Sequence, residues 1–572
     1  MFSGWLKRSR LAALLLGCSA LAGVTSQAQD TAGPIVTVTG GQVQGQMLSG
    51  PGGAIFKGIP YASPPVGDLR WRETQPLKPW TGVKQAVEYG PGCPSPDNGR
   101  RRASAEDCLF INVIAPQWPA APGKKLPVMF WINGGELTGG AASFRPGSES
   151  LARHGVVLVS ANYRGQLFGM VGHPELTAES PHHASGNYMF YDEAAALKWV
   201  HDNIARFGGD PANVTVFGQS GGAHFISMFL TSPLAKGLVH RAIVESGAVA
   251  DIRPYLTLKD LEQMGVLMAQ ALNAPSTGAI AYLRSLPAEK ITSAMAAVRG
   301  GMAKLNYNSY DEGIDGYTVP ENPPDVFRDH KELSIPLMVG NTARDSGVVN
   351  AADPHADFSP TSGHVLNKIP ANDAEAAAWA RSALETYYGK YPDLLDQALK
   401  AYGVSGPAQE NIHYAPYGTL AQQIGSDINH RCGTRVMANW HSSIAPTWEW
   451  EFSRSVPGPA LHGSELTYVF GTLSKEQLAD PNAVKVRDIV QTYWTNFART
   501  GNPNGPNVPE WPKFDAGHPQ SIEIVDDGAV ARTANRATAC AAYVEKFKRD
   551  PHPMLGGENR AIRPGNLGGS YD

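Results

Sequence analysis

The stretch from 213 to 230, NVTVFGQSGGAHFISMFL, constrains the fold more than any other part of the chain. Residues 214–217 are β-branched or aromatic and predict a buried strand. The G-x-S-x-G pattern of residues 218–222 interrupts this strand, and an apolar helical segment follows at 223–230. Such a pattern also arises by chance in a glycine-rich chain, so the interpretation depends on the flanking strand and helix. Together they predict a sharp turn that holds the hydroxyl of Ser220 at a helix N-terminus, where free N–H groups favour negative charge on oxygen.

Composition is that of an ordinary globular protein. The 572 residues are 42% hydrophobic and 17% charged, which is enough material for one large α/β core. The formal net charge of −4 argues against a nucleic-acid partner. No histidine or cysteine cluster has the spacing of metal ligands, so we expect no metal and no cofactor. The oligomeric state is not encoded in any recognisable pattern.

The N-terminus predicts a cleaved signal peptide at residues 1–28. Three basic residues lie within positions 7–10, and Leu11–Val24 is apolar but too short and wrongly flanked to span a membrane. The small residues before Gln29 predict cleavage after Ala28. Residues 15–18 also loosely resemble a lipoprotein motif, in which Cys18 would carry a lipid anchor. Because Leu16 is bulky for that motif, we rank the lipid anchor second to a cleaved signal peptide. We therefore expect a secreted or periplasmic protein.

Four cysteines remain after the predicted cleavage: Cys93, Cys108, Cys432 and Cys540. An even number in an exported protein predicts two disulfides. The sequence by itself allows three pairings, of which the short loop between Cys93 and Cys108 is the easiest to close.

Buried strands and helices alternate through the rest of the chain. Further strands are predicted at 127–132, 156–163, 241–247, 335–340 and 448–452, and mostly helical regions at 252–330 and 372–445. This alternation is typical of an α/β fold. We expect one domain over residues 29–555 and a glycine-rich tail at 556–572.

Several segments resemble one family. FKGIPYASPPVGDLRW (56–71), EDCLFINV (106–113), NIARFGGDP (203–211) and LHGSELTYVF (461–470) are similar to motifs of the type B carboxylesterases, which include the cholinesterases. The resemblance covers nearly the whole mature chain and is that of a bacterial secreted member. It implies an α/β-hydrolase fold: a mostly parallel central sheet, helices on both faces, and helical insertions that cap the site. It also implies a serine carboxylesterase that hydrolyses a small-molecule ester.

The resemblance implies a catalytic Ser220, with His462 as the base and Asp345 as the acid. The order Ser, acid, His along the chain is that of α/β-hydrolases. The family usually has Glu where Asp345 stands, and a shift of one residue would place Ser346 there instead. Asp311–Gly313 imitates the acid motif but precedes the turn that the acid should follow.

The resemblance also implies an oxyanion hole made by the backbone N–H groups of Gly135, Glu136 and Gly221. Two residues of this loop depart from the family pattern: Asn133 replaces His or Tyr, and Glu136 replaces a small residue. A carboxylate would oppose a developing oxyanion, so we expect Glu136 to point away, to be neutral, or to be paired, and to shape substrate choice. Ser246 stands where the family has a hydroxyl near the catalytic His, and a supporting role is expected.

Structural pairs follow from the same resemblance. It implies disulfides between Cys93 and Cys108 and between Cys432 and Cys540, and the ion pairs Arg70–Glu106 and Arg164–Asp192.

The substrate is where the sequence is least informative. The loop between Cys93 and Cys108 has no aromatic residue to bind a quaternary ammonium, which argues against a choline ester. Arg100, Arg101 and Arg102 favour an anionic ester, although a solvated basic run is the more common interpretation. Two alternatives remain open: a binding or adhesion member of the fold, and hydrolysis of an amide or carbamate.

Overall fold

The computed structural model describes residues 33–50, 52–94, 104–135, 144, 147–250, 255–304, 312–345, 348–350, 353–358, 373–408, 414–533 and 535–550. Several predicted features lie outside these residues: the signal peptide with Cys18, Arg100–Arg102, Glu136, Ser346 and the tail at 556–572.

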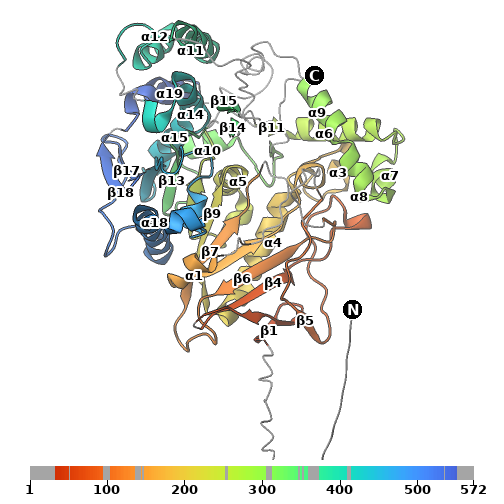
Figure 1. Cartoon of the computed structure of the whole chain (residues 1–572). Coiled ribbons are helices and arrows are strands. Elements are labelled where there is room, and N and C mark those ends of the chain that lie inside the picture. Colours follow the sequence, from red (N-terminus) through yellow and green to blue (C-terminus); the bar gives the residue numbers. More distant parts are fainter. Residues whose placement is uncertain are drawn as a thin grey trace, which may run out of the picture.

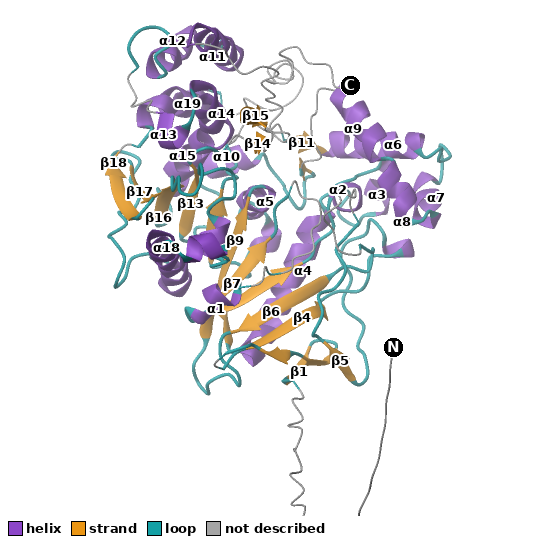
Figure 2. Ribbon diagram, viewed as in Figure 1, coloured by secondary structure: helices purple, strands orange, loops and turns teal. Residues whose placement is uncertain are grey.

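A large twisted sheet runs through the middle of the molecule (Figures 1 and 2). Among the described residues it has eleven strands, in the order β18-β17-β16-β13-β10-β9-β7-β8-β6-β4-β3. Their bounds are β18 Gly528–Thr533, β17 Gln520–Val525, β16 Thr447–Phe452, β13 Leu337–Thr342, β10 Arg241–Glu245, β9 Gly209–Gln219, β7 Leu126–Ile132, β8 Val157–Ala161, β6 Phe110–Ala115, β4 Ala54–Pro60 and β3 Gln46–Met47. All pairs from β17 to β8 are parallel, and the pairs at both ends of the sheet are antiparallel. The mostly parallel α/β fold predicted from the sequence is confirmed.

The sheet separates two hydrophobic clusters. Val128, Phe130 and Ile132 of β7 point into one cluster, and Met129 and Trp131 point into the other. This alternation follows from the two-residue period of a strand, and it makes the central strands apolar on both faces.

Helices cover both faces. Helices α4 (Tyr188–Asn203) and α5 (Gly221–Phe229) contribute to the first cluster, whereas α18 (Pro481–Thr500) contributes to the second. Two further groups of helices stand at the upper right and upper left of Figure 1. They are α6 (Leu258–Ala271), α7 (Ala279–Ser285), α8 (Ala288–Ser293) and α9 (Met295–Lys304), and then α11 (Asp373–Tyr388), α12 (Pro392–Ala401), α14 (Leu420–Ser426), α15 (Cys432–His441) and α19 (Ala537–Arg549).

A short hairpin stands at the N-terminal end of the described chain. β1 (Ile35–Val38) pairs with β2 (Gly41–Gln44) in antiparallel fashion. The segment around Phe56 forms β4 and pairs with β6 in the large sheet. The buried ring of Phe56, which packs against Phe207, shows why the large sheet takes this strand.

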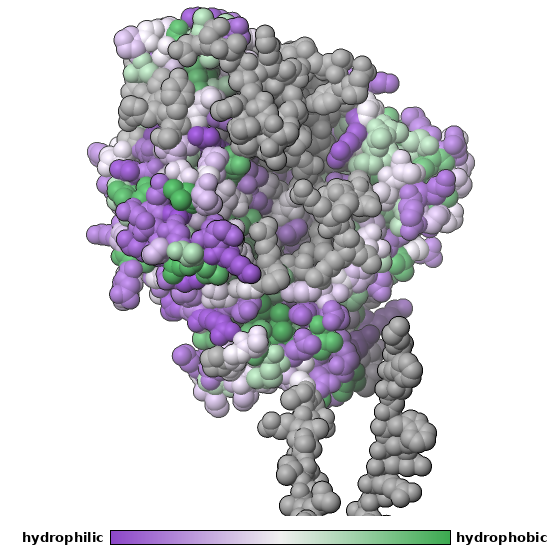
Figure 3. Space-filling model, in the orientation of Figure 1, coloured by the Kyte–Doolittle hydropathy of each residue, from purple (hydrophilic) through white to green (hydrophobic). Residues whose placement is uncertain are grey.

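Both expected disulfides are present, Cys93–Cys108 and Cys432–Cys540. The second closes a separation of 108 residues and ties the start of α15 to α19. On the face seen in Figure 3, hydrophilic and hydrophobic residues are interspersed over the described surface. None of the helices in the described ranges combines the length and the apolar character needed to cross a membrane.

Lys546 of α19 is a buried lysine whose amino group lies against an aromatic ring. Its Nζ lies 3.5 Å from the ring centroid of Tyr387, and the residue is 4% exposed. Burial lowers the pKa of Lys546 to about 7, although Asp550 acts in the opposite direction. In the unfolded chain the ordinary value is about 10.4, so between these values the unfolded state binds more protons than the folded state.

We therefore expect the stability of the wild-type protein to rise with pH between 7 and 9 through this group. Lys546→Met should remove that increase and raise the free energy of unfolding at pH 7 by roughly 1–3 kcal/mol, since an apolar side chain carries no desolvation cost. Urea unfolding of both proteins at pH 7 and pH 9 measures the difference. An equal change of unfolding free energy with pH in the two proteins would contradict the lowered pKa of Lys546.

Candidate active site

The turn at Ser220 has the predicted strand–turn–helix geometry. β9 ends at Gln219 and α5 begins at Gly221, with Ser220 between them at φ 58° and ψ −127°. A serine rarely adopts a positive φ, and such strain costs on the order of 1–3 kcal/mol. The backbone N–H of Ser220 donates to the carbonyl of Glu245 at 2.9 Å, and its own carbonyl accepts from the N–H of His224 at 2.9 Å. These bonds hold the turn, whose shape leaves the serine at the N-terminus of α5.

The loop after β7 packs directly against this turn. A Cβ atom on Gly134 would lie 2.2 Å from the carbonyl oxygen of Gln219 and 3.4 Å from Cβ of Ser220. The carbonyl of Asn133 accepts a hydrogen bond from the Tyr163 hydroxyl, and its side chain donates to the carbonyl of Gly134 at 3.0 Å. Gly135 follows with a φ of 89°. The backbone before the predicted oxyanion donors is therefore held close to Ser220.

Asp345 and His462 meet at the carboxyl ends of the parallel strands. Oδ1 of Asp345 is hydrogen-bonded to Nδ1 of His462, 117 residues further along the chain. The residues just before them are also paired: the backbone of Arg344 forms an isolated parallel bridge with that of Leu461. Oδ2 of Asp345 accepts from the Ser246 hydroxyl at 2.7 Å and from the backbone N–H of Thr342 at 2.9 Å. Ser246 thus supports the acid, whereas the sequence suggested a place near the histidine.

The pKa of Asp345 lies well below its ordinary value. Burial by itself raises it, but this effect is outweighed by the nearby imidazoles of His430 and His462 and by the hydrogen bonds from His462 and Ser246. The carboxylate therefore stays ionised over the whole neutral range and can stabilise positive charge on His462.

Two other carboxyl groups are buried close to this region. Burial raises the pKa of Glu245 to about 8, even though the indole N–H of Trp494 donates to its carboxylate at 2.8 Å. Burial, followed by the charges of Glu245 and Asp345, also raises the pKa of Glu465 well above its ordinary value. Of these three carboxyl groups, only that of Asp345 has a lowered pKa, so that only there does the environment favour the ionised form.

Gln219 contacts the other side of the histidine ring. Its Nε2 lies 3.0 Å from Nε2 of His462. With Nδ1–H directed at Asp345, Nε2 of His462 is the acceptor of this contact. The residue next to Ser220 therefore touches the predicted base. Sequence reasoning assigned no role to Gln219, although it lies within the recognised pentapeptide.

Sequence reasoning also missed His430. The ring centroids of His430 and His462 are 5.2 Å apart, and their planes differ by 26°. His430 belongs to a π-helical turn, Asp427–Arg431, between α14 and α15. Such turns are rare and frequently occur at functional sites. The helical region at 372–445 was expected to cap the site, and this turn of it packs beside the predicted base. The only local feature of the sequence that could have drawn attention to His430 is its position two residues before Cys432.

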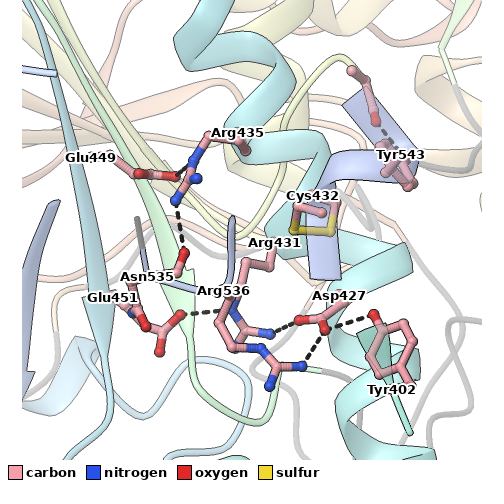
Figure 4. Close-up of a disulfide and its surroundings, with 12 residues drawn as sticks. Tyr402, Asp427, Arg431, Cys432, Arg435, Glu449, Glu451, Asn535, Arg536 and Tyr543 are labelled. Atoms are coloured by element: carbon pink, nitrogen blue, oxygen red, sulfur yellow. Dashed lines mark hydrogen bonds and ion pairs between the residues drawn. A yellow bond between two sulfur atoms is a disulfide. The ribbon is translucent and has the colours of Figure 1, made fainter. Parts of the chain in front are cut away.

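A buried ionic network secures the π-helical turn (Figure 4). The Arg431 guanidinium donates to the carbonyl of Ala343 at 2.8 Å and to the carboxylate of Glu451 at 2.6 Å, and it pairs with Asp427. Asp427 also accepts from Arg536 at 2.5 Å and from the Tyr402 hydroxyl at 2.7 Å. Arg431 thereby ties the turn to the backbone two residues before Asp345. The disulfide at Cys432 joins the same turn to α19.

The remaining predicted pairs are found in the structure. Arg70 and Glu106 form an ion pair at 2.5 Å, and Arg164 and Asp192 form one at 2.8 Å. Glu312, in the segment that imitates the acid motif, lies 3.3 Å from Nδ1 of His224 and is fully buried. It thus lies beside a different imidazole from that of His462.

Comparison with known proteins gives the same fold and family. The model of the carboxylesterase family matches residues 32–543. Carboxylesterase 1C of Rattus norvegicus is 31% identical over 554 residues, which cover 91% of this chain and 94% of that protein. Fumonisin B1 esterase of Sphingopyxis macrogoltabida is 32% identical over 485 residues, which cover 80% of this chain and 81% of that protein. A solved PNB esterase matches with a TM-score of 0.71 and 30% identity, covering 89% of this chain and 99% of its own. This chain belongs to the carboxylesterase family and is a carboxylesterase of the α/β-hydrolase fold.

Proposed function

We propose that this protein is a serine hydrolase in which Ser220, His462 and Asp345 hydrolyse a carboxylic ester through an acyl-enzyme. The observation that carries the proposal is the hydrogen bond between Nδ1 of His462 and Asp345, beside the strained turn that bears Ser220. This bond selects the tautomer whose Nε2 carries the lone pair that can accept a proton.

In the first half of the reaction, His462 takes the proton of Ser220 while the serine oxygen attacks the ester carbonyl carbon. The tetrahedral intermediate collapses, His462 protonates the leaving alcohol, and the acyl group remains on Ser220. In the second half, His462 removes a proton from water as the water attacks the acyl carbon. The second tetrahedral intermediate then collapses, the acid leaves, and His462 returns the proton to Ser220. Asp345 stabilises the imidazolium formed in each half.

The backbone N–H groups of Gly135, Glu136 and Gly221 are the proposed donors to the oxyanion. Gly221 is the first residue of α5, so its N–H carries the partial positive charge of a helix N-terminus. Close packing of Gly134 against the turn supports a hole formed by both segments. One such donor is worth about 10²–10³ in kcat.

The substrate is proposed to be a small or medium organic ester, with anionic esters included because of Arg100–Arg102. We also propose that the protein is exported, and two disulfides are compatible with an oxidising compartment.

Covalent labelling tests the proposed nucleophile directly. The purified mature protein should react stoichiometrically with an organophosphate, and peptide mass spectrometry should place the label on Ser220. The same protein should hydrolyse p-nitrophenyl acetate and butyrate, and the label should abolish this turnover. Folded protein that neither reacts nor turns over these esters would contradict the proposal and favour a binding role.

A further inference from the structure

We propose that Asp345, His430 and His462 form an inhibitory site for a divalent transition-metal ion of which zinc is the best match. Each residue offers one ligand atom, and the three atoms lie within 4.8 Å of one another. The ion would act on the base of the proposed reaction, so the inhibition rests on the proposed function. It would be an inhibitor and not a cofactor of ester hydrolysis.

The donor set matches zinc. Two imidazole nitrogens and one carboxylate oxygen are ligands that Zn²⁺ binds readily, and water or a substrate atom commonly takes the fourth position. Calcium and magnesium prefer sites made of oxygen ligands and should bind here poorly.

The spacing is close to that of a bound ion. With metal–ligand bonds of about 2.0–2.2 Å and tetrahedral angles, ligand atoms lie about 3.3 Å apart and two imidazole centroids about 5 Å apart. The centroids of His430 and His462 are 5.2 Å apart, and Asp345 already contacts His462. Closing the site therefore requires the ligand atoms, which now lie within 4.8 Å of one another, to approach to about 3.3 Å.

Two of the three residues are held firmly, and the third offers access. Asp345 is fixed by hydrogen bonds from Ser246 and Thr342, and His430 is next to Arg431, which the buried network fixes. The side chain of His462 is 28% exposed, so an ion can reach it from solvent.

An ion at this position would stop the proposed reaction in either orientation of the His462 ring. Bound through Nε2, the ion takes the lone pair that accepts the proton of Ser220. Bound through Nδ1, it replaces the proton shared with Asp345 and removes the tautomer needed for general base catalysis. Removal of the ion restores both groups, so the inhibition should be reversible.

Inhibition of p-nitrophenyl acetate hydrolysis by ZnCl₂ at pH 7.5, in a buffer that does not chelate metals, is the first measurement. We expect inhibition at micromolar zinc that EDTA reverses, and none from the same concentration of MgCl₂. For His430→Phe, which retains an aromatic ring, the zinc concentration for half inhibition of that variant's own rate should rise more than about tenfold. His430→Asn serves as a second variant should the first not fold. His201→Asn removes an exposed histidine that lies 2.9 Å from Asp202, and its zinc sensitivity should equal that of the wild type.

Calorimetric titration with ZnCl₂ separates binding from activity. Ser220→Ala protein, which keeps all three proposed ligands, should bind one ion per chain, and adding His430→Phe should weaken binding more than about tenfold. Equal binding by the two proteins, or none by the first, would overturn the metal site whether or not the protein hydrolyses esters. An inactive wild-type protein that still binds zinc through His430 would count against the proposed function alone.

Discussion

Ser220→Ala is expected to lower kcat for p-nitrophenyl esters by about 10⁴–10⁶ while the protein keeps its fold. The side chain is the proposed nucleophile, and alanine cannot form the acyl-enzyme. The strained backbone at φ 58° should also relax little, because the turn is held by hydrogen bonds to Glu245 and His224. Steady-state kinetics and thermal unfolding measured on the same preparations test this expectation.

Ser227→Ala is the matched control for that substitution. Ser227 is buried within α5, the helix that follows Ser220, and its hydroxyl donates to the carbonyl of Gly247 at 2.8 Å. Loss of one buried hydrogen bond costs about 1–3 kcal/mol of stability, and kcat should stay within a few-fold of the wild-type value. Comparable loss of activity in both variants would indicate a folding defect and would argue against Ser220 as nucleophile.

Asp345→Asn is expected to lower kcat by about 10⁴, the second largest effect. An amide side chain of the same shape can donate to Nδ1 of His462 and so favours the tautomer that presents a proton to Ser220. It also removes the negative charge that stabilises the imidazolium. Kinetics at pH 7.5 on p-nitrophenyl acetate, with thermal unfolding as the check on folding, measure the effect.

The comparison variant for Asp345 is Ser246→Ala, which keeps the carboxylate and removes one hydrogen bond of 2.7 Å. We expect a loss of about tenfold, since a hydrogen bond to a charged group contributes about 1.5–3 kcal/mol. An Asp345→Asn enzyme with nearly full activity would exclude Asp345 as the acid and would direct attention to another carboxylate.

The pH dependence of Asp345 follows from the direction of its shift. Its folded-state pKa is below the ordinary value of about 3.9, so its contribution to stability is fully present above that value and is lost as pH falls through the folded-state pKa. Any loss of wild-type activity between pH 7 and 5 would therefore arise from a group other than Asp345.

Local patterns determined the main elements of this protein. Continuous apolar runs rich in β-branched and aromatic residues predicted the core strands, and the strand before Ser220 was found as β9. The glycines on either side of Ser220 predicted the sharp turn, because a bulky side chain would strike the neighbouring backbone: a Cβ on Gly222 would lie 2.2 Å from the carbonyl oxygen of Ile132. Family motifs, which carry information that periodicity does not, implied Asp345, His462 and both disulfides.

Only the tertiary structure decided which side chains surround the acid and the base. Asp345 and His462 are 117 residues apart, and the distance between them depends on the parallel bridge from Arg344 to Leu461. His430 reaches His462 because a π-helical turn rotates it there and Arg431 ties that turn to the carbonyl of Ala343. Such contacts depend on the packing of distant segments, whose register is not encoded in any local pattern. The sequence could therefore single out Asp345 and His462, which meet in the structure, but not the glutamine and the second histidine beside them.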